Sequence, residues 1–155
     1  MRQKFSQHTA SRLRFSDPLL ESAHGRTIVF VTEESNLRSE AKLMPHFFQR
    51  TGASSSSKVL GYSHFYDCPE GITADILILR SSKLFPLHLG KLHKALEAFR
   101  GPNPKAAAII SLLDTSLLSC FEQFASAGLV NFVETALADD PALIKAGLKI
   151  LEHMQ

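Results

Sequence analysis

Two adjacent acidic residues, Glu33 and Glu34, follow one apolar run, and a permanently charged cation, Arg80, follows another. If both runs end at the same edge of a fold, the two carboxylates repel each other unless a cation lies beside them. The Arg80 guanidinium can pair with one carboxylate or with both. Two interpretations stay open: an internal ion pair that holds a pocket in one state, or an Arg80 side chain that points to solvent.

A second group of ligand-type side chains is gathered in one short segment, at His64, Tyr66, Asp67 and Cys68. Zinc needs three or four ligands in a defined geometry, and no second His/Cys pair with suitable spacing accompanies this segment. The serine run 54–57 lacks a glycine-rich phosphate cradle, and no dinucleotide motif follows the first apolar run. We therefore expect no metal and no cofactor, and a segment whose polar groups are satisfied locally.

The two cysteines, Cys68 and Cys120, are too few for a disulfide scaffold and fit a reduced, intracellular, cytoplasmic protein with buried thiols. Cys120 lies in the apolar stretch 117–124, so we predict a core residue rather than a nucleophile. His88 and His93 are five apart and do not share a helix face, which predicts surface or partly buried positions.

Composition describes one globular domain with a basic extension. The chain has 155 residues, 45% hydrophobic and 21% charged, with a net charge of +2. No stretch of about 18 apolar residues is present, so no membrane contact is expected. Residues 1–26 hold five cations and two acids, hence +3, and the remainder is near neutral. The extension, residues 1–25, could fold back on the body, touch a partner or direct the chain to an organelle; its acids weaken the last interpretation.

The body, residues 26–155, alternates apolar runs with helical patterns. Strands are predicted at 27–32, 58–65, 74–79, 107–113 and 129–133, and helices at 35–49, 86–99, 116–127 and from 140 onward. Ser35 and Asp140 are the expected helix caps. Strands without polar alternation are buried on both faces, as in a parallel sheet. The pattern predicts an α/β, flavodoxin-like, doubly wound sheet of five parallel strands in the order 2-1-3-4-5.

One connection is too short for this fold in its usual form. Only about eight residues separate Phe65 from Ala74, and they reach about 26 Å when extended. A parallel crossover normally takes a dozen residues or more, usually with a helix. We therefore expect the second helix to be reduced or absent, either as a turn around 67–71 or through a second strand that ends near Gly61.

The chain resembles the receiver domains of bacterial two-component response regulators over about residues 26–153. The segment Ala127–Phe132 resembles the family's Ala-Gly turn followed by an aromatic, and Asp140–Ile144 resembles the start of its last helix. Glu33 and Glu34 stand where the family places its acidic metal-binding pair. The resemblance implies Mg²⁺ at that pair and a nucleophilic Asp at the end of the third strand.

Two essential parts of that machinery are missing from this sequence. Arg80 stands where the nucleophilic Asp is expected, and a guanidinium cannot deprotonate to attack phosphorus. The fifth strand ends Val133-Glu134-Thr135, without the family's lysine, whereas Ser111 matches the hydroxyl position. The resemblance therefore implies a pseudo-receiver with a vestigial pocket of Glu33, Glu34, Arg80 and Ser111, and no phosphorylation by the family's mechanism.

We expect a non-enzymatic signalling or regulatory module that acts through protein–protein contacts, with a protein partner or a second copy. The family's docking face implies Phe121, Ala125, Phe132, Leu143 and Lys145 as contact residues, although Phe132 equally fits core packing. Two alternatives stay open. One is a small enzyme or ligand-binding domain with Glu33, Glu34, Ser81, Ser82 and Asp114 around its site. The other is the regulatory part of a larger transcription regulator, which would contact nucleic acid only through an absent or partner domain.

Overall fold

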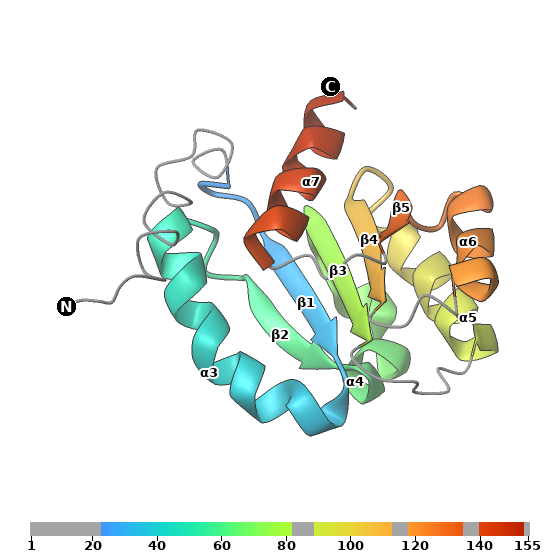
Figure 1. Cartoon of the computed structure of the whole chain (residues 1–155), viewed down its shortest axis with the longest axis horizontal. Helices are drawn as coiled ribbons and strands as arrows, with labels where there is room; N and C mark the ends of the chain where they lie inside the picture. Colours follow the sequence, from blue (N-terminus) through green and yellow to red (C-terminus); the bar gives the residue numbers. More distant parts are fainter. Residues whose placement is uncertain (1–22, 82–88, 113–117, 135–139, 154–155) are drawn as a thin grey trace.

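The computed structural model describes residues 23–81, 89–112, 118–134 and 140–153. Five parallel strands form one sheet in the order β2-β1-β3-β4-β5. Their bounds are β1 Ile28–Thr32, β2 Lys58–Gly61, β3 Ile76–Ser81, β4 Ala107–Leu112 and β5 Phe132–Glu134. The predicted fold class and strand order are confirmed. Because all strands run the same way, their carboxyl ends meet at one edge, near α4 in Figure 1.

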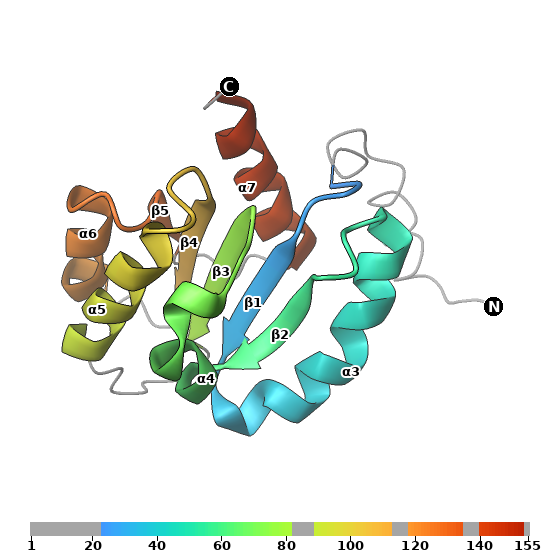
Figure 2. The same ribbon diagram turned by 180° about the vertical axis from the view of Figure 1, so that it is seen from behind.

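Helices cover both faces of the sheet (Figures 1 and 2). The α3 helix (Glu34–Thr51) and the α7 helix (Asp140–His153) pack on one face. The opposite face carries α4 (Tyr62–Asp67), α5 (Leu89–Arg100) and α6 (Leu118–Ser126), with the short 3₁₀ turn η1 (Pro69–Gly71) beside α4. No helix in the described ranges is long and apolar enough to cross a membrane.

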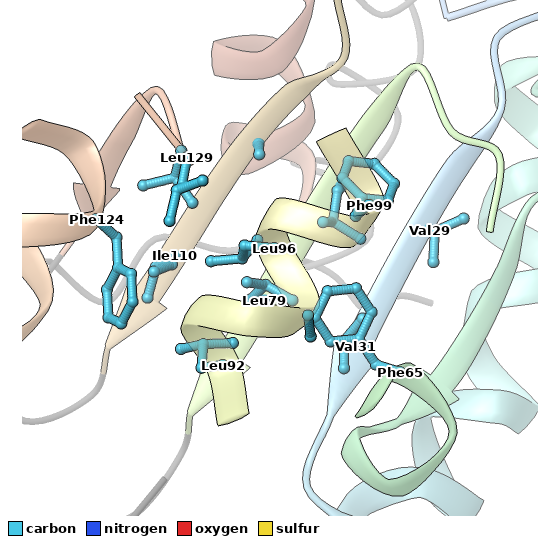
Figure 3. Packing of buried hydrophobic residues seen from close by; sticks show 14 of the residues in the cluster. Val29, Val31, Phe65, Leu79, Leu92, Leu96, Phe99, Ile110, Phe124 and Leu129 are labelled. Atoms are coloured by element: carbon cyan, nitrogen blue, oxygen red, sulfur yellow. The ribbon is translucent and has the colours of Figure 1, made fainter. Parts of the chain in front are cut away.

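Side-chain alternation divides the core between these two faces. Val29 and Val31 of β1 point into the α4–α6 side, where Phe65, Phe99 and Phe124 fill the space (Figure 3). Ile28 and Phe30 of the same strand point to the α3/α7 side. All five residues of β1 are buried, which explains why its sequence shows no polar alternation. Each fully buried phenylalanine or branched aliphatic side chain contributes about 1.5–3 kcal/mol.

The second helix is reduced, as its short connection predicted. The β2 strand ends at Gly61, α4 has six residues and η1 has three. So short a helix is not stable by itself. Tyr62 and Phe65, which are 4% and 0% exposed, anchor α4 in the core, and Ile72 anchors the chain after η1. Both forms of the predicted shortening therefore occur together.

The α3 helix begins two residues earlier than a Ser35 cap predicts. Glu33, not Ser35, occupies the N-cap position, and the helix continues through Pro45 to Thr51. It ends at Gly52, whose φ of 74° is left-handed, and the Gly52 and Ala53 N–H groups bond back to the last turn. The expectation of a Ser35 cap was wrong because the polypeptide turns into the helix directly after Thr32.

The β5 strand begins three residues later than predicted. After α6, Gly128 adopts a φ of 77°, and the N–H groups of Leu129 and Val130 bond to the Phe124 carbonyl. These two residues are buried, but their amides close the helix instead of joining the sheet. Pairing with β4 starts only through Asn131, whose N–H donates to the Ala108 carbonyl at 2.7 Å.

Candidate functional site

A row of polar residues lies at the carboxyl edge, on the α3/α7 face of the sheet. Thr32 is the last residue of β1, and Arg80 and Ser111 are paired across β3 and β4. Two residues earlier in the same three strands, Phe30, Ile78 and Ile109 pack on the α3/α7 side of the core. Because residues two apart on a strand share a face, Thr32, Arg80 and Ser111 point to that side as well. Thr32 and Ser111 are 1% and 8% exposed, so the row is mostly enclosed.

Glu40 of α3 joins two members of this row. The Thr32 hydroxyl donates to Glu40 Oε2 at 2.9 Å, and Arg80 Nη1 donates to Glu40 Oε1 at 3.4 Å. The side chains of Arg80 and Glu40 are 30% and 18% exposed, so their ion pair is only partly screened by water. Arg80 is therefore held by an internal carboxylate at the carboxyl edge, and the alternative of an Arg80 that simply points to solvent is wrong.

The two adjacent acids diverge instead of forming a pair. Glu33 is 5% exposed at the N-cap of α3, where the Asn36 side-chain amide lies 3.5 Å from its Oε1. Glu34 reaches toward β2, and its Oε2 accepts a hydrogen bond from the Ser63 N–H at 3.1 Å. A Cβ at Gly61 would overlap the Glu34 carboxylate. Glycine at this position therefore makes room for the acid that caps the start of α4.

Tyr62 contacts the carboxyl edge from the α4–α6 face of the sheet, opposite to the polar row. Its hydroxyl donates to the Arg80 carbonyl at 2.9 Å. Burial raises the pKa of Tyr62 well above its usual value, with smaller upward contributions from Tyr66 and Glu33 and an opposing one from Arg80. Tyr62 therefore stays neutral and acts as a hydrogen-bond donor. Burial also raises the pKa of Tyr66 to about 12; its hydroxyl is buried without a hydrogen-bond partner among the described residues.

The geometry does not suit the Mg²⁺ that the receiver resemblance implies. Magnesium binds carboxylates that converge in near-octahedral geometry. Here Glu34 lies against Gly61, Glu33 sits at a helix N-cap, and Glu40 already pairs with Arg80. Among the described residues, no group of three His, Cys, Asp or Glu is placed to hold a metal ion. The chemistry that this arrangement shows is an ion pair, in which the Arg80 guanidinium neutralises the Glu40 carboxylate.

Glu40 is the residue that sequence reasoning missed. It lies seven positions after Glu33, which is two helical turns and thus the same helix face. That spacing was the available signal, but only the packing of α3 against β2 shows that the second turn reaches Arg80. Ser111 lies beside Arg80 as predicted, whereas the side chain of Ser81 and residues 82 and 114 fall outside the described part of the chain.

Other sequence candidates have a structural setting. His64, Asp67 and Cys68 are exposed on and after α4 and share a cavity of about 520 Å³ with Glu34. His93 is exposed, lies 3.4 Å from Glu97 and has its ring near Phe124, as a surface histidine should. His88 lies outside the described residues.

Both thiols are exposed, so the prediction of buried cysteines was wrong. The α6 helix turns Phe121 and Phe124 inward, at 2% and 1% exposure. Cys120 precedes Phe121 by one residue, which rotates it about 100° around the helix and places it in solvent.

Two members of the predicted interaction face lie in the core instead. Phe121 and Leu143 are 2% and 1% exposed, because they point from α6 and α7 toward the sheet. A partner cannot reach them in this conformation. Ala125, Phe132 and Lys145 are half-buried, and Phe132 packs against the α3/α7 side of the core. The face, if used, consists of these three residues and their exposed neighbours.

No family model matches the chain, and no curated protein matches it. Similar solved structures include a putative pilus assembly-related protein from Burkholderia pseudomallei, with 18% identity, a TM-score of 0.46, and 84% of this chain and 92% of that chain covered. The pilus assembly protein CpaE from Caulobacter crescentus has 10% identity, a TM-score of 0.46, and 81% and 94% coverage. A LuxR family DNA-binding response regulator from Silicibacter pomeroyi has 17% identity, a TM-score of 0.45, and 82% and 92% coverage. At these scores the likenesses carry no argument about function.

Proposed function

We propose that this chain is a receiver-like signalling domain that works without phosphorylation. The strand order and the acid, Ala-Gly and Asp-Pro positions along the chain support the receiver resemblance. The observation that carries the second half of the proposal is Arg80. At the end of β3, where a receiver needs a nucleophilic carboxylate, the chain has a guanidinium held by Glu40.

This substitution changes the electrostatics of the whole edge. A phosphorylated receiver collects negative charge on its carboxylates and offsets it with Mg²⁺. Here a built-in cation, Arg80, compensates the Glu40 carboxylate, and the side chains of Glu33 and Glu34 have different hydrogen-bond partners. A pocket without a transferable charge has no chemical trigger. The domain is then a constitutive module whose output is set by contact with another protein or a second copy.

Exposure to a small phosphoryl donor with Mg²⁺ tests the proposal. The full chain is incubated with acetyl phosphate, and its intact mass is measured after rapid acid quench. We expect no added phosphoryl group, with or without Mg²⁺. A bona fide receiver treated in parallel is the positive control, and Ser111→Ala is the matched variant for hydroxyl modification. A hydroxylamine-sensitive phosphoryl adduct on this chain, which indicates an acyl phosphate, would contradict the proposal.

Contact with a partner is tested separately. Sedimentation velocity over a range of concentrations reports self-association, and substitution of the half-buried Lys145 by Glu reverses a charge on the remaining accessible face. We expect a concentration-dependent species that Lys145→Glu weakens. An unchanged monomer in both proteins removes the homodimer from the proposal.

A further inference from the structure

A cavity of about 540 Å³ lies at the amino ends of the strands, opposite to the edge that carries Arg80 (Figure 1). Its walls come from the segments that precede β1, β3 and β4 and from Leu151 near the end of α7. All of its lining residues belong to the described part of the chain. Small-molecule sites have volumes of about 300–1,000 Å³, so this cavity is large enough for a small organic ligand.

Hydrogen bonds fix two walls of this cavity. Asn103 is 6% exposed, its side-chain oxygen accepts from the Ala74 N–H at 3.1 Å, and its side-chain amide donates to the Ile72 carbonyl at 2.7 Å. Asp75 Oδ2 accepts from the Thr27 N–H at 2.8 Å. Walls that are already in place lose little conformational freedom when a ligand binds. The cavity is therefore a preformed site and not a gap that a ligand has to open.

The lining of the cavity carries a net positive charge. Arg26, ahead of β1, is half-buried, and Lys105, ahead of β4, is exposed. In the described part of the chain, neither side chain forms an ion pair with a carboxylate. The lining has one acid, Asp75, and one of its oxygens is engaged by a main-chain N–H. Two cations against one acid favour an anionic ligand.

The two edges of the sheet differ in the charge that they leave available. Doubly wound sheets usually bind ligands at the carboxyl edge, but here Arg80 is paired with Glu40 at that edge. At the amino edge, helix C-termini carry a partial negative charge. Arg100 donates to main-chain carbonyls just after the C-terminal end of α5 and so offsets that charge internally. Arg26 and Lys105 are the cations that remain beside the cavity.

We propose that this amino-edge cavity binds a small organic anion, whose carboxylate or phosphate pairs with Arg26 and whose apolar body packs against Pro102, Pro104 and Leu151. A guanidinium binds either headgroup through parallel hydrogen bonds. Lys105, which is exposed, attracts the anion toward the site. The proposal does not depend on the absence of phosphorylation at the opposite edge, so the two can fail separately.

Titration of the isotope-labelled full chain tests the proposal, with amide chemical shifts followed by NMR. The probes are phenyl phosphate, benzoate and inorganic phosphate, with benzyl alcohol as the neutral control. We expect saturable shifts at the Asp75 and Ala106 amides with the two aromatic anions, and none at Ser63 at the opposite edge. Inorganic phosphate should bind more weakly because it lacks an apolar body, and the tighter aromatic anion identifies the preferred headgroup. The absence of saturable shifts with all three anions, or equal binding of benzyl alcohol, overturns the proposal.

Substitutions of the lining cations locate the binding site. Arg26→Gln should weaken binding about tenfold, as the loss of a hydrogen bond to a charged group does, and Arg26→Lys should retain part of the affinity. Lys105→Gln should weaken it about threefold, because an exposed cation contributes less. Lys91→Gln, which removes an exposed cation near the start of α5, is the matched control and should bind normally.

Urea denaturation of the same variants separates a binding site from a structural role of the cations. Arg26→Gln could destabilise the chain because its charge offsets the negative end of a nearby helix. If Arg26→Gln lowers the free energy of unfolding but binds the aromatic anions as tightly as the unmodified chain, the cations serve only the fold and the proposal is wrong. Weaker binding in a variant whose amide spectrum remains that of the folded protein supports it.

Discussion

The two edges of the sheet use arginine in different ways. At the carboxyl edge, Arg80 is held by the carboxylate of Glu40. At the amino edge, Arg100 donates to the main-chain carbonyls of Leu129, Asn103 and Ala106 and to the side chain of Asn131. Burial lowers the pKa of Arg100. An ion pair compensates a charge, whereas a guanidinium shared among carbonyls ties chain segments together. The comparison teaches that Arg100 specifies the fold and Arg80 sets the electrostatics of the site.

Removal of Arg100 tests the structural half of this comparison and should have the largest effect. Arg100→Ala leaves buried carbonyls between α5, β4 and β5 without a donor, and hydrogen bonds to charged groups are worth about 1.5–3 kcal/mol each. We expect the free energy of unfolding to fall by about 3 kcal/mol, measured by urea denaturation with circular dichroism. Arg100→Lys should recover only part of this loss, because an ammonium cannot span all the acceptors. A loss below that of Arg80→Ala would reverse the comparison.

Gly61→Ala tests how tightly the carboxyl edge is packed. The new methyl group displaces the Glu34 carboxylate, so the bond to the Ser63 N–H at the start of α4 is lost. We expect a loss of about 2 kcal/mol, the value of a charge-assisted hydrogen bond. Glu34→Ala is the matched control: if the two changes act on the same contact, the double variant should be no less stable than either single one. Additive losses of unfolding free energy would show that Gly61 and Glu34 do not act on the same contact.

Tyr62→Phe separates the hydrogen bond at this edge from its charges. Loss of the hydroxyl that donates to the Arg80 carbonyl should cost about 1 kcal/mol at neutral pH. The pKa of Tyr62 is raised on folding. Its contribution is therefore complete below the unfolded pKa of about 10 and is lost as pH rises from there toward the folded value. Above pH 10, the free energy of unfolding of Tyr62→Phe should therefore fall less steeply with pH than that of the unmodified protein. Part of the pH dependence remains in the variant, because Tyr66 also has a raised pKa, of about 12.

The Arg80–Glu40 ion pair should show the smallest effect on stability. The atoms are 3.4 Å apart and partly exposed, so a double-mutant cycle with Arg80→Ala and Glu40→Ala should give a coupling energy of about 0.5 kcal/mol. The coupling should weaken in high salt. A coupling energy larger than the loss of unfolding free energy in Arg100→Ala would show that charge compensation, and not bonding to the backbone, holds the molecule together.

The sheet could be predicted because its signals are local. Unbroken apolar runs such as Ile28–Thr32 identify buried parallel strands, and the eight residues between Phe65 and Ala74 were too few for a full helix. The site was harder, because it depends on rotation about a helix axis. Glu33 and Glu34 are neighbours in sequence, yet one is the N-cap and the other a helical residue, so their side chains leave in different directions.

The same rotation explains the errors at α6 and α7. Apolar residues surround Cys120 in sequence, and only the observed helix phase shows that Phe121 takes the inward position. Leu143 was assigned to an interaction face from resemblance, but it fills the space under α7. The role of Glu40 could not be predicted from the sequence, because its partner Arg80 lies forty residues away, on β3.

The contact between Glu34 and the start of α4 has a mechanical consequence. It joins α3 and α4, which pack on opposite faces of the sheet, at Gly61, the last residue of β2. A displacement of α3 would therefore act on α4 through this hydrogen bond as well as through the packed side chains of the sheet. The Glu34 carboxylate thus couples the position of α3 on one face of the sheet to the position of α4 on the other.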